Sequence, residues 1–296
     1  MKKFICIDIG GTSIKYGYVY EDGIIIQKGE MDTEALLKGG AGILSKCKAI
    51  CRAIINKYKV VDGICISTAG MVDPDEGKII YSIEHLIPGY TGMGLKAEIE
   101  KEFDIRCEVE NDVNCAALGE AWLGSGRDSD SSVCMTIGTG IGGAVIINGK
   151  IHHGHSNSAG EIGYININGK PFQDQASTTS LVKAAAAKKG IDPSEINGKI
   201  IFEGAKNGDN DYISAIEDLI KVLAEGISNV AYLLNPEVII LGGGIMAQEE
   251  FIRPRLKKEL KKVLVETVYK NTRIEFAYMK NNAGMLGALR NFLNKN

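Results

Sequence analysis

The fold is indicated by the segment IDIGGTSIK at residues 7–15, which recurs in altered form as TIGTGIGG at residues 136–143. Each copy consists of an apolar strand, a turn rich in glycine and threonine, and a second apolar strand. Glycine has no Cβ, so the backbone N–H groups of such a turn can approach an anion closely. Two of these turns, one in each half of the chain, predict a duplicated fold that holds a polyphosphate, and they point to phosphoryl transfer.

The composition is that of an ordinary globular protein and argues against several classes of function. The chain has 296 residues, which favours about two domains, and 45% of its residues are hydrophobic. Lys and Arg number 34 against 37 Asp and Glu, for a net charge of −3. Without a basic block, nucleic acid is not expected as the main partner. No apolar run reaches the roughly 18 residues that span a membrane. The N-terminus enters a strand directly, without a signal peptide, so we expect a cytoplasmic protein.

The seven cysteines are expected to be buried thiols rather than disulfides or metal ligands. Cys6, Cys65, Cys107 and Cys134 lie in apolar runs, where free cysteine behaves as a small hydrophobic residue. The count is odd and no C-x-x-C pair occurs, which argues against a disulfide framework.

Signals for strands and helices alternate along the chain, and their order repeats. In the first half we expect strands at 3–9, 14–20, 23–30, 61–67 and 105–110, with helices at about 34–58 and 94–102. In the second half we expect strands at 132–138, 142–148, 237–241 and 273–278, with helices near 177–189 and 211–234. Such alternation predicts an α/β fold with a largely parallel sheet. The repeated order predicts a duplicated actin-like, ribonuclease-H-like architecture.

Asp8 stands at the end of the first strand, beside the first glycine turn. A carboxylate there could hold Mg²⁺, directly or through water, while the turn amides hold phosphate oxygens. The alternative is a plain hairpin with a solvated aspartate, because Asp-x-Gly-Gly is common turn chemistry. The second turn favours the functional interpretation. The chain has no G-x-x-x-x-G-K-[ST] segment, which excludes a Walker-type P-loop.

A third glycine segment, residues 241–245, follows a strand and is expected to open a helix. Glycine amides at a helix N-terminus can bind an anion or a nucleotide. Glycine at a strand-to-helix turn is also common for steric reasons alone. The spacing lacks the G-x-G-x-x-G fingerprint, so a Rossmann site is not supported.

The sharpest polar cluster is VENDVN at residues 109–114, at the C-terminal end of a predicted strand. Open α/β sheets bind ligands at this edge. Asp112 could accept a proton from an attacking hydroxyl while Asn111 orients the substrate, and such a base contributes about 10²–10⁴-fold to a rate. The alternative is helix N-capping, for which Asn and Asp are favoured. One residue could cap the helix while the other catalyses.

Six segments, taken in order, resemble the ROK (repressor, open reading frame, kinase) family of sugar kinases. They cover essentially the whole chain, at residues 8–15, 69–73, 110–117, 138–143, 159–163 and 235–243. The first sugar loop departs from the family pattern, because Ala69 stands where a proline is usual. The resemblance implies two lobes with a nucleotide and sugar cleft between them. We expect one lobe of residues 1–112 plus 284–296 and another of residues 113–283.

The resemblance also implies ATP-dependent phosphorylation of a sugar hydroxyl, commonly the 6-hydroxyl of a hexose, with Asp112 as general base. Mg²⁺ would be held at Asp8, directly or through water, and the family favours a homodimer. The expected ATP and phosphate residues are Asp8, Gly10, Gly11, Thr12, Lys15, Gly138, Thr139, Gly140, Gly242 and Gly243. The expected sugar-binding residues are Gly70, Asn111, Asp112, Glu161, Gln173 and His155.

The chain departs from the family at its structural zinc site. Tyr164 stands in place of the usual histidine, and residues 169–177 contain none of the usual cysteines, so we expect no zinc. Gln173 replaces a glutamate that usually contacts the sugar. His152, His153 and His155 are close neighbours, yet a zinc site normally needs four well-placed ligands. His155 is assigned instead to the sugar.

Within the family, members without the zinc site that carry a first loop like this one are similar to the β-glucoside kinases. The Tyr-Thr-Gly segment at residues 90–92 of this chain also resembles that subgroup. This subgroup implies a disaccharide such as cellobiose as acceptor, with glucose and N-acetylmannosamine as alternatives. Another class is a sugar-sensing repressor, which would need a helix-turn-helix before the first strand and a basic footprint. A non-catalytic sugar-binding or regulatory protein, and another actin-like ATPase or acyl-phosphate kinase, stay open.

Overall fold

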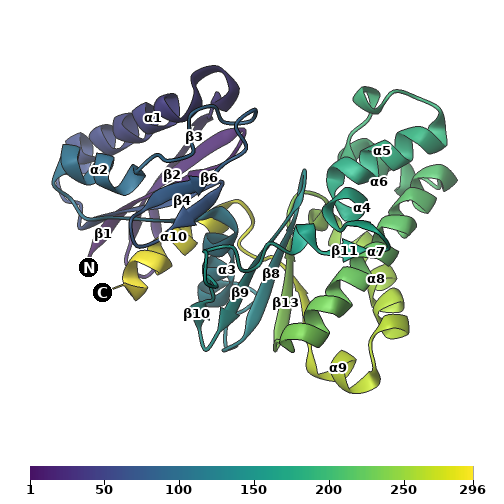
Figure 1. The fold of residues 1–296 in the computed structure, drawn as a ribbon. Helices are drawn as coiled ribbons and strands as arrows, with labels where there is room; N and C mark the ends of the chain where they lie inside the picture. Colours follow the sequence, from purple (N-terminus) through teal and green to yellow (C-terminus); the bar gives the residue numbers. More distant parts are fainter. Residues whose placement is uncertain (296) are drawn as a thin grey trace. The chain divides into compact units, whose positions relative to one another are not determined.

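The computed structural model describes residues 1–295 and divides them into two compact units (Figure 1). Unit 1 comprises residues 1–127, 153–158 and the C-terminal residues from 281 onward. Unit 2 comprises residues 128–152 and 159–280. Unit 1 therefore continues past residue 112, the limit expected for the first lobe, through the helix that follows. No helix within residues 1–295 has the length and apolar character needed to cross a membrane.

Unit 1 contains a five-stranded sheet in the order β3-β2-β1-β4-β7. Its strands are β1 (Lys3–Ile9), β2 (Ser13–Tyr20), β3 (Ile25–Asp32), β4 (Gly63–Thr68) and β7 (Cys107–Asn111). A separate hairpin is formed by β5 (Met71–Asp73) and β6 (Lys78–Tyr81). The helices are α1 (Ala35–Tyr58), α2 (Leu95–Phe103), α3 (Asp112–Leu123) and α10 (Ala283–Asn294). The first three strands are antiparallel, and β4 and β7 continue the sheet in parallel.

The two faces of β1 pack against different helices, because side chains alternate along a strand. Ile5, Ile7 and Ile9 belong to the core beneath α1. Phe4 points to the other face, where its ring meets Phe292 of α10 at 5.3 Å. The sheet is thus covered by helices on both sides.

Helix α1 is bent near its start, where a continuous helix was expected. Gly39 has φ +55°, and a Cβ there would lie 2.4 Å from the carbonyl oxygen of Pro88. The Gly40 amide donates to the same oxygen at 2.9 Å. The loop after β6 therefore fixes the bend, and glycine is required there because a side chain would collide with backbone.

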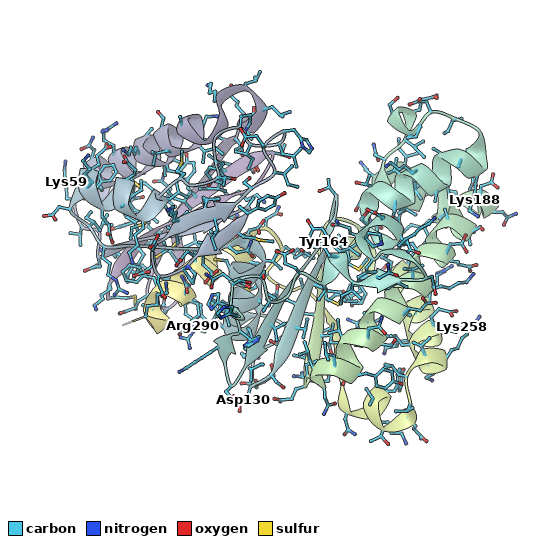
Figure 2. All side chains as sticks on the ribbon, in the orientation of Figure 1. Lys59, Asp130, Tyr164, Lys188, Lys258 and Arg290 are labelled. Atoms are coloured by element: carbon cyan, nitrogen blue, oxygen red, sulfur yellow. The ribbon has the colours of Figure 1, made fainter. Side chains whose placement is uncertain are left out.

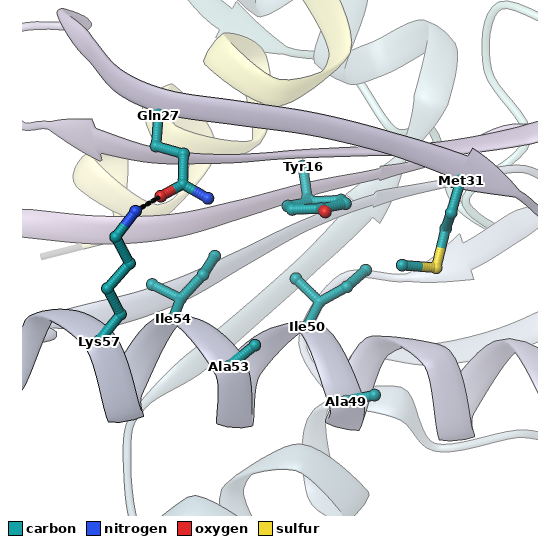
Figure 3. Close-up of a pocket in the computed structure, with 8 residues that line it drawn as sticks. All are labelled: Tyr16, Gln27, Met31, Ala49, Ile50, Ala53, Ile54 and Lys57. Atoms are coloured by element: carbon teal, nitrogen blue, oxygen red, sulfur yellow. Dashed lines mark hydrogen bonds between the residues drawn. The ribbon is translucent and has the colours of Figure 1, made fainter.

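A cavity of about 220 Å³ lies between α1 and strands β2 and β3 (Figure 3). Tyr16, Met31, Ile50 and Ile54 line much of it, and a hydrogen bond from Lys57 to Gln27 lies at one end. None of its eight lining residues is among the expected site residues.

Unit 2 contains a second five-stranded sheet in the order β10-β9-β8-β13-β14. Its strands are β8 (Ser132–Ile137), β9 (Ile141–Ile147), β10 (Lys150–Ile151), β13 (Val238–Gly242) and β14 (Arg273–Phe276), and β11 (Asn166–Ile167) and β12 (Lys170–Pro171) form a small ribbon. The α-helices are α4 (Gln173–Ala176), α5 (Thr178–Lys189), α6 (Gly198–Lys206), α7 (Asn210–Leu234), α8 (Glu249–Val263) and α9 (Glu266–Asn271).

The two sheets repeat one topology, which confirms the duplicated actin-like α/β fold. In each, the first two strands of the copy form the hairpin that carries a glycine turn, and two later strands continue the sheet in parallel. The register makes Asp8 and Thr136 equivalent. Asp8 pairs with Lys15 and Ser67, and Thr136 pairs with Gly142 and Gly242. All seven cysteines are free and buried, as expected.

Candidate active site

The first glycine turn is held in place by Thr33, which follows β3. The Thr33 hydroxyl donates to the Gly10 carbonyl oxygen at 2.7 Å, and its amide donates to that of Thr12 at 2.9 Å. The Gly10 amide donates to Ser13 O at 3.0 Å and closes the turn. Thr33 is fully buried, while Gly11 and Thr12 are exposed at the tip. The turn is therefore fixed from inside and presents its tip outward, as an anion cradle requires.

Asp8 is held beside this turn by contacts from three directions. Ser67 of β4 donates a hydrogen bond of 2.7 Å to Asp8 Oδ1. Lys15 is its partner across β1 and β2. Gly284 lies in the first turn of α10, and a Cβ there would come within 2.4 Å of Oδ1. The carboxylate therefore meets the N-terminal end of a helix, where negative charge is favoured. Burial raises the pKa of Asp8, although the Ser67 hydrogen bond and the Lys15 charge lower it.

A hydrated cation fits this arrangement. The Ser67 hydrogen bond is made to Asp8 Oδ1. Within residues 1–295 no hydrogen bond is made to the other carboxylate oxygen, Oδ2, which leaves that oxygen for a cation or its water. A hard oxygen ligand beside a phosphate-type turn is the donor that Mg²⁺ prefers, with several waters retained.

Replacing Gly284 with alanine should impair catalysis more than folding. The added Cβ would displace the Asp8 carboxylate, while alanine favours a helix over glycine by about 1 kcal/mol. We expect kcat/KM to fall by about 10- to 100-fold and the apparent KM for Mg²⁺ to rise, with little change in Tm. Ser67→Ala removes a hydrogen bond without adding bulk and should cost less. Wild-type kinetics in Gly284→Ala would contradict the assigned role of Asp8.

The corner between β7 and α3 carries the acidic and amide side chains expected at the reaction centre. Asn111 caps α3, because its Oδ1 accepts from the amides of Val113 at 2.9 Å and Asn114 at 3.0 Å. Its Nδ2 donates to Gly70 O at 2.9 Å and to Asp112 Oδ1 at 3.0 Å. Asn111 is therefore the capping residue and leaves Asp112 available as a base. It also ties the loop after β4 to that base.

The pKa of Asp112 is raised into the neutral range. Burial, followed by the negative charge of Asp8, raises its pKa to about 7. Hydrogen bonds from the Val113 amide, its own amide and Asn111 oppose this rise. A base is most effective when its pKa lies near the working pH. Asp112 can thus accept a proton under neutral conditions.

The loop at residues 68–70 is anchored by a buried hydroxyl pair. Thr68 Oγ1 and the Tyr90 hydroxyl lie 2.5 Å apart. The Ala69 amide donates to Ile9 O at 3.1 Å, and Gly70 has φ +99°. Sequence reasoning used Tyr90 only as part of a family likeness and missed its role in fixing the loop.

In unit 2, the start of α5 holds the second glycine turn. The Thr178 amide donates to Gly138 O at 2.8 Å, and the Thr179 hydroxyl donates to Thr139 O at 2.8 Å. The Gly138 amide donates to Gly140 O at 2.9 Å, while Thr139 is exposed. In both glycine turns, therefore, threonine residues outside the turn donate hydrogen bonds to the carbonyl oxygens of the turn.

Gln173 lies beside that turn, at the start of α4. Its Oε1 would be 2.7 Å from a Cβ on Gly140 and 3.2 Å from one on Gly163. Glu161 is exposed. The residue before it, Gly160, packs closely against Gly143 of β9. A Cβ on either glycine would lie within 2.6 Å of the carbonyl oxygen of the other. The structure therefore brings Gln173 to the second turn and the Glu161 loop to β9.

The third glycine segment differs from expectation, because it opens a 3₁₀ helix (η3, Ile245–Gln248) and α8 begins only at Glu249. Gly243 has φ +100°, and a Cβ there would lie 2.2 Å from Ile137 O. Glycine is therefore required by the close approach to β8, and Gly242 and Gly243 lie next to the strand that leads into the second turn.

The histidines after β10 and the tyrosine at the family's zinc position lie at the surface. His152 and His155 are exposed, and Tyr164, labelled in Figure 2, is 58% exposed. No three His, Cys, Asp or Glu side chains within residues 1–295 are grouped to hold a metal ion.

Comparisons with known proteins agree with this geometry. The ROK family model matches residues 4–295. The β-glucoside kinase of Listeria innocua is 35% identical, over 98% of this chain and 97% of its own. A ROK family protein from Streptococcus pneumoniae, solved in complex with sucrose, has a TM-score of 0.85 and 30% identity, covering 99% of this chain and 98% of its own. A ROK family glucokinase from Streptomyces griseus, in complex with glucose and AMPPNP, has a TM-score of 0.82 and 27% identity, covering 97% and 98%.

The duplicated sheets and paired glycine turns define an actin-like fold. The chain belongs to the ROK family, within its ATP-dependent sugar kinases. The resemblance found in the sequence motifs is thereby confirmed.

Proposed function

We propose that this protein transfers the γ-phosphoryl group of ATP to a hydroxyl of a β-glucoside such as cellobiose, at the 6-hydroxyl of a glucose unit. The observation that carries the proposal is the pKa of Asp112, which burial and the negative charge of Asp8 raise to about 7. The Asp112 carboxylate also accepts a hydrogen bond from Asn111. A positioned base of this kind suits an alcohol acceptor, which must lose a proton as it attacks.

In the proposed reaction, Asp112 takes the proton of the sugar hydroxyl as its oxygen attacks the γ-phosphorus. The new O–P bond forms as the bond to the β-phosphate oxygen breaks, and ADP leaves. The glycine turns at 10–12 and 138–140, with Lys15, would hold phosphate oxygens, and Gly242 and Gly243 would lie on the nucleotide side. Mg²⁺, held near Asp8 through water, would neutralise charge on the phosphates.

Sugar recognition is assigned to polar residues of the sugar motifs in the sequence. Gly70, Asn111, Glu161, Gln173 and His155 are the proposed contacts. Hydroxyl-specific binding discriminates strongly, since a wrong sugar leaves polar groups of the site unpaired. We further propose that the enzyme acts without zinc, in the cytoplasm and as a homodimer.

The β-glucoside assignment is supported by the 35% identical Listeria innocua enzyme. The Streptococcus pneumoniae relative in complex with sucrose also supports a site of disaccharide size. A glucokinase or an N-acetylmannosamine kinase is the alternative. The Streptomyces griseus glucokinase supports glucose, and a 32% identical structure from Listeria monocytogenes, described as an N-acetylmannosamine kinase, supports N-acetylmannosamine.

The proposal is tested by ADP release with ATP and Mg²⁺ on glucose, cellobiose, gentiobiose, N-acetylmannosamine, N-acetylglucosamine and fructose. We expect cellobiose or gentiobiose to give the highest kcat/KM, with a phosphorylated disaccharide identified by mass spectrometry. Turnover on glucose or N-acetylmannosamine alone would replace the β-glucoside with that acceptor. Binding of ATP and sugar without turnover would favour a regulatory protein.

A further inference from the structure

A buried carboxylate that the proposed reaction does not use lies next to the base. Glu110 is the penultimate residue of β7, and its side chain is only 1% exposed. Its Oε1 accepts from the Asn111 amide at 2.8 Å and from Asn114 Nδ2 at 3.0 Å. Its Oε2 lies 2.8 Å from His153 Nε2. A buried carboxylate is costly unless hydrogen-bonded, and here His153 supplies the partner for Oε2.

His153 begins a short segment that leaves the flanking chain. Residues 128–152 and 159–280 belong to unit 2, but residues 153–158 pack with unit 1. Within residues 1–295, the side-chain hydrogen bonds made by this segment are that of His153 to Glu110 and one between Ser156 and Ser158. The Glu110–His153 bond is therefore the polar anchor of the segment on unit 1.

This anchor couples two groups of proposed sugar contacts. On one side, Glu110 precedes Asn111 and Asp112 and holds their corner through the Asn111 amide and Asn114. On the other side, His153 comes two residues before His155, within the same segment of unit 1. A shift of one side relative to the other would draw a proposed contact away from the sugar, and one hydrogen bond left unmade weakens binding by about tenfold.

We propose that Glu110 and His153 are positioning residues that hold the 153–158 segment against the β7–α3 corner and thereby set the affinity for the acceptor sugar. The inference rests on the proposed function, since it concerns acceptor binding. Neither residue touches the reacting atoms. Their effect is expected in the acceptor KM rather than in kcat or the ATP KM.

The test compares His153→Ala and His153→Gln with His152→Ala as matched control, since His152 is the exposed neighbouring histidine. His153→Ala should raise the acceptor KM about tenfold, with kcat and the ATP KM within about twofold. His153→Gln should recover most of the affinity, because its amide N–H can donate to Glu110. The ¹⁵N order parameters of residues 153–158 should fall in His153→Ala and stay at the wild-type level in His153→Gln and His152→Ala.

Several results would overturn the inference. One is an unchanged acceptor KM in His153→Ala, and another is an equal rise in His152→Ala, which would indicate a general effect of the loop. Unchanged order parameters at 153–158 in His153→Ala would show that the bond does not anchor the segment. Order parameters need no turnover, so a wild-type protein inactive on all sugars would defeat the proposed function while the anchor is still tested. If His153→Ala unfolds, the comparison of His153→Gln with wild type decides, and a large rise in KM despite the retained donor counts against the anchor.

Discussion

Asp112→Asn should lower kcat by about 10²–10⁴-fold, because it removes the carboxylate that we propose takes the hydroxyl proton. Asparagine keeps the size of the side chain and can keep an oxygen toward the Val113 amide, which donates to Asp112 Oδ1 at 3.0 Å. ATP binding should therefore survive. The measurement is steady-state ADP release with the acceptor found for the wild type, together with ATP affinity by calorimetry.

The same residue should set the pH dependence of the wild type. The base works only when unprotonated, so kcat/KM for the sugar should fall as pH drops below the Asp112 pKa of about 7. An acid limb near pH 4, the range of an ordinary aspartate, would contradict the burial and Asp8 charge that raise this pKa.

Stability should respond in the opposite sense to activity. The pKa of Asp112 rises from 3.8 to about 7 on folding, so the folded protein binds the proton more tightly. That stabilising contribution is complete below pH 3.8 and is lost as pH rises through 7, at about 1.4 kcal/mol per pKa unit. Asp112→Asn cannot ionise, so its unfolding free energy should exceed that of the wild type at pH 8, and the difference should vanish near pH 4.

The control is Asp104→Asn, at the C-cap of α2, where the residue is exposed and has φ +53°. Asparagine tolerates this left-handed conformation, so kcat and the pH profile should stay as in the wild type. If Asp112→Asn kept wild-type kcat, or if Asp104→Asn lost as much, Asp112 would not be the base.

The strands and the polar corner at Asp112 were predictable because their signals are local. Alternating apolar residues flanked by glycine turns predict the hairpins, and a polar run after an apolar strand predicts the corner at Asn111 and Asp112. The capping alternative was also visible, since Asn at a helix start is a local preference. The structure assigns it to Asn111 and leaves Asp112 free of that role.

The contacts that hold these groups were not predictable, because they join residues distant in the chain. Ser67 lies 59 residues from Asp8, and nothing in its strand distinguishes its hydroxyl from that of a core serine. In the sequence, nothing distinguishes Gly284 from any other glycine in a helix. Only the structure shows that it packs against the Asp8 carboxylate. The 3₁₀ helix after Gly243 and the bend at Gly39 likewise follow from backbone contacts with Ile137 and Pro88. Such contacts depend on packing, which periodicity does not encode.

Gly287→Ala should be the most destabilising of these substitutions. A Cβ at Gly287 of α10 would lie 1.6 Å from the carbonyl oxygen of Cys115 in α3. Gly119 of α3 meets α10 in the same way, since its Cβ would lie 2.6 Å from Ala283 O. The two helices thus touch backbone to backbone. Neither can move without disturbing neighbours such as Arg290, labelled in Figure 2, whose guanidinium lies over the Trp122 ring.

Overpacking of a core typically costs about 1–3 kcal/mol, and here the obstacle is backbone rather than a flexible side chain. We therefore expect Gly287→Ala to lose about 3 kcal/mol of unfolding free energy or more, despite the higher helix propensity of alanine. Urea unfolding should show this as a lower midpoint. The control is Gly244→Ala, where φ is −58° and no atom lies within 4 Å of the new Cβ, so the midpoint should stay near that of the wild type.

The same substitution should also reduce activity under conditions where the protein is still folded. Gly284, against the Asp8 carboxylate, lies one turn before Gly287 on α10, so a helix pushed away from α3 carries Gly284 with it. A rise in the apparent KM for Mg²⁺ in folded Gly287→Ala would link the α3–α10 contact to Asp8. Equal urea midpoints for Gly287→Ala and the wild type would mean that α3 and α10 do not meet at their backbones. The packing that supports both Asp8 and the Asp112 corner would then have to be assigned elsewhere.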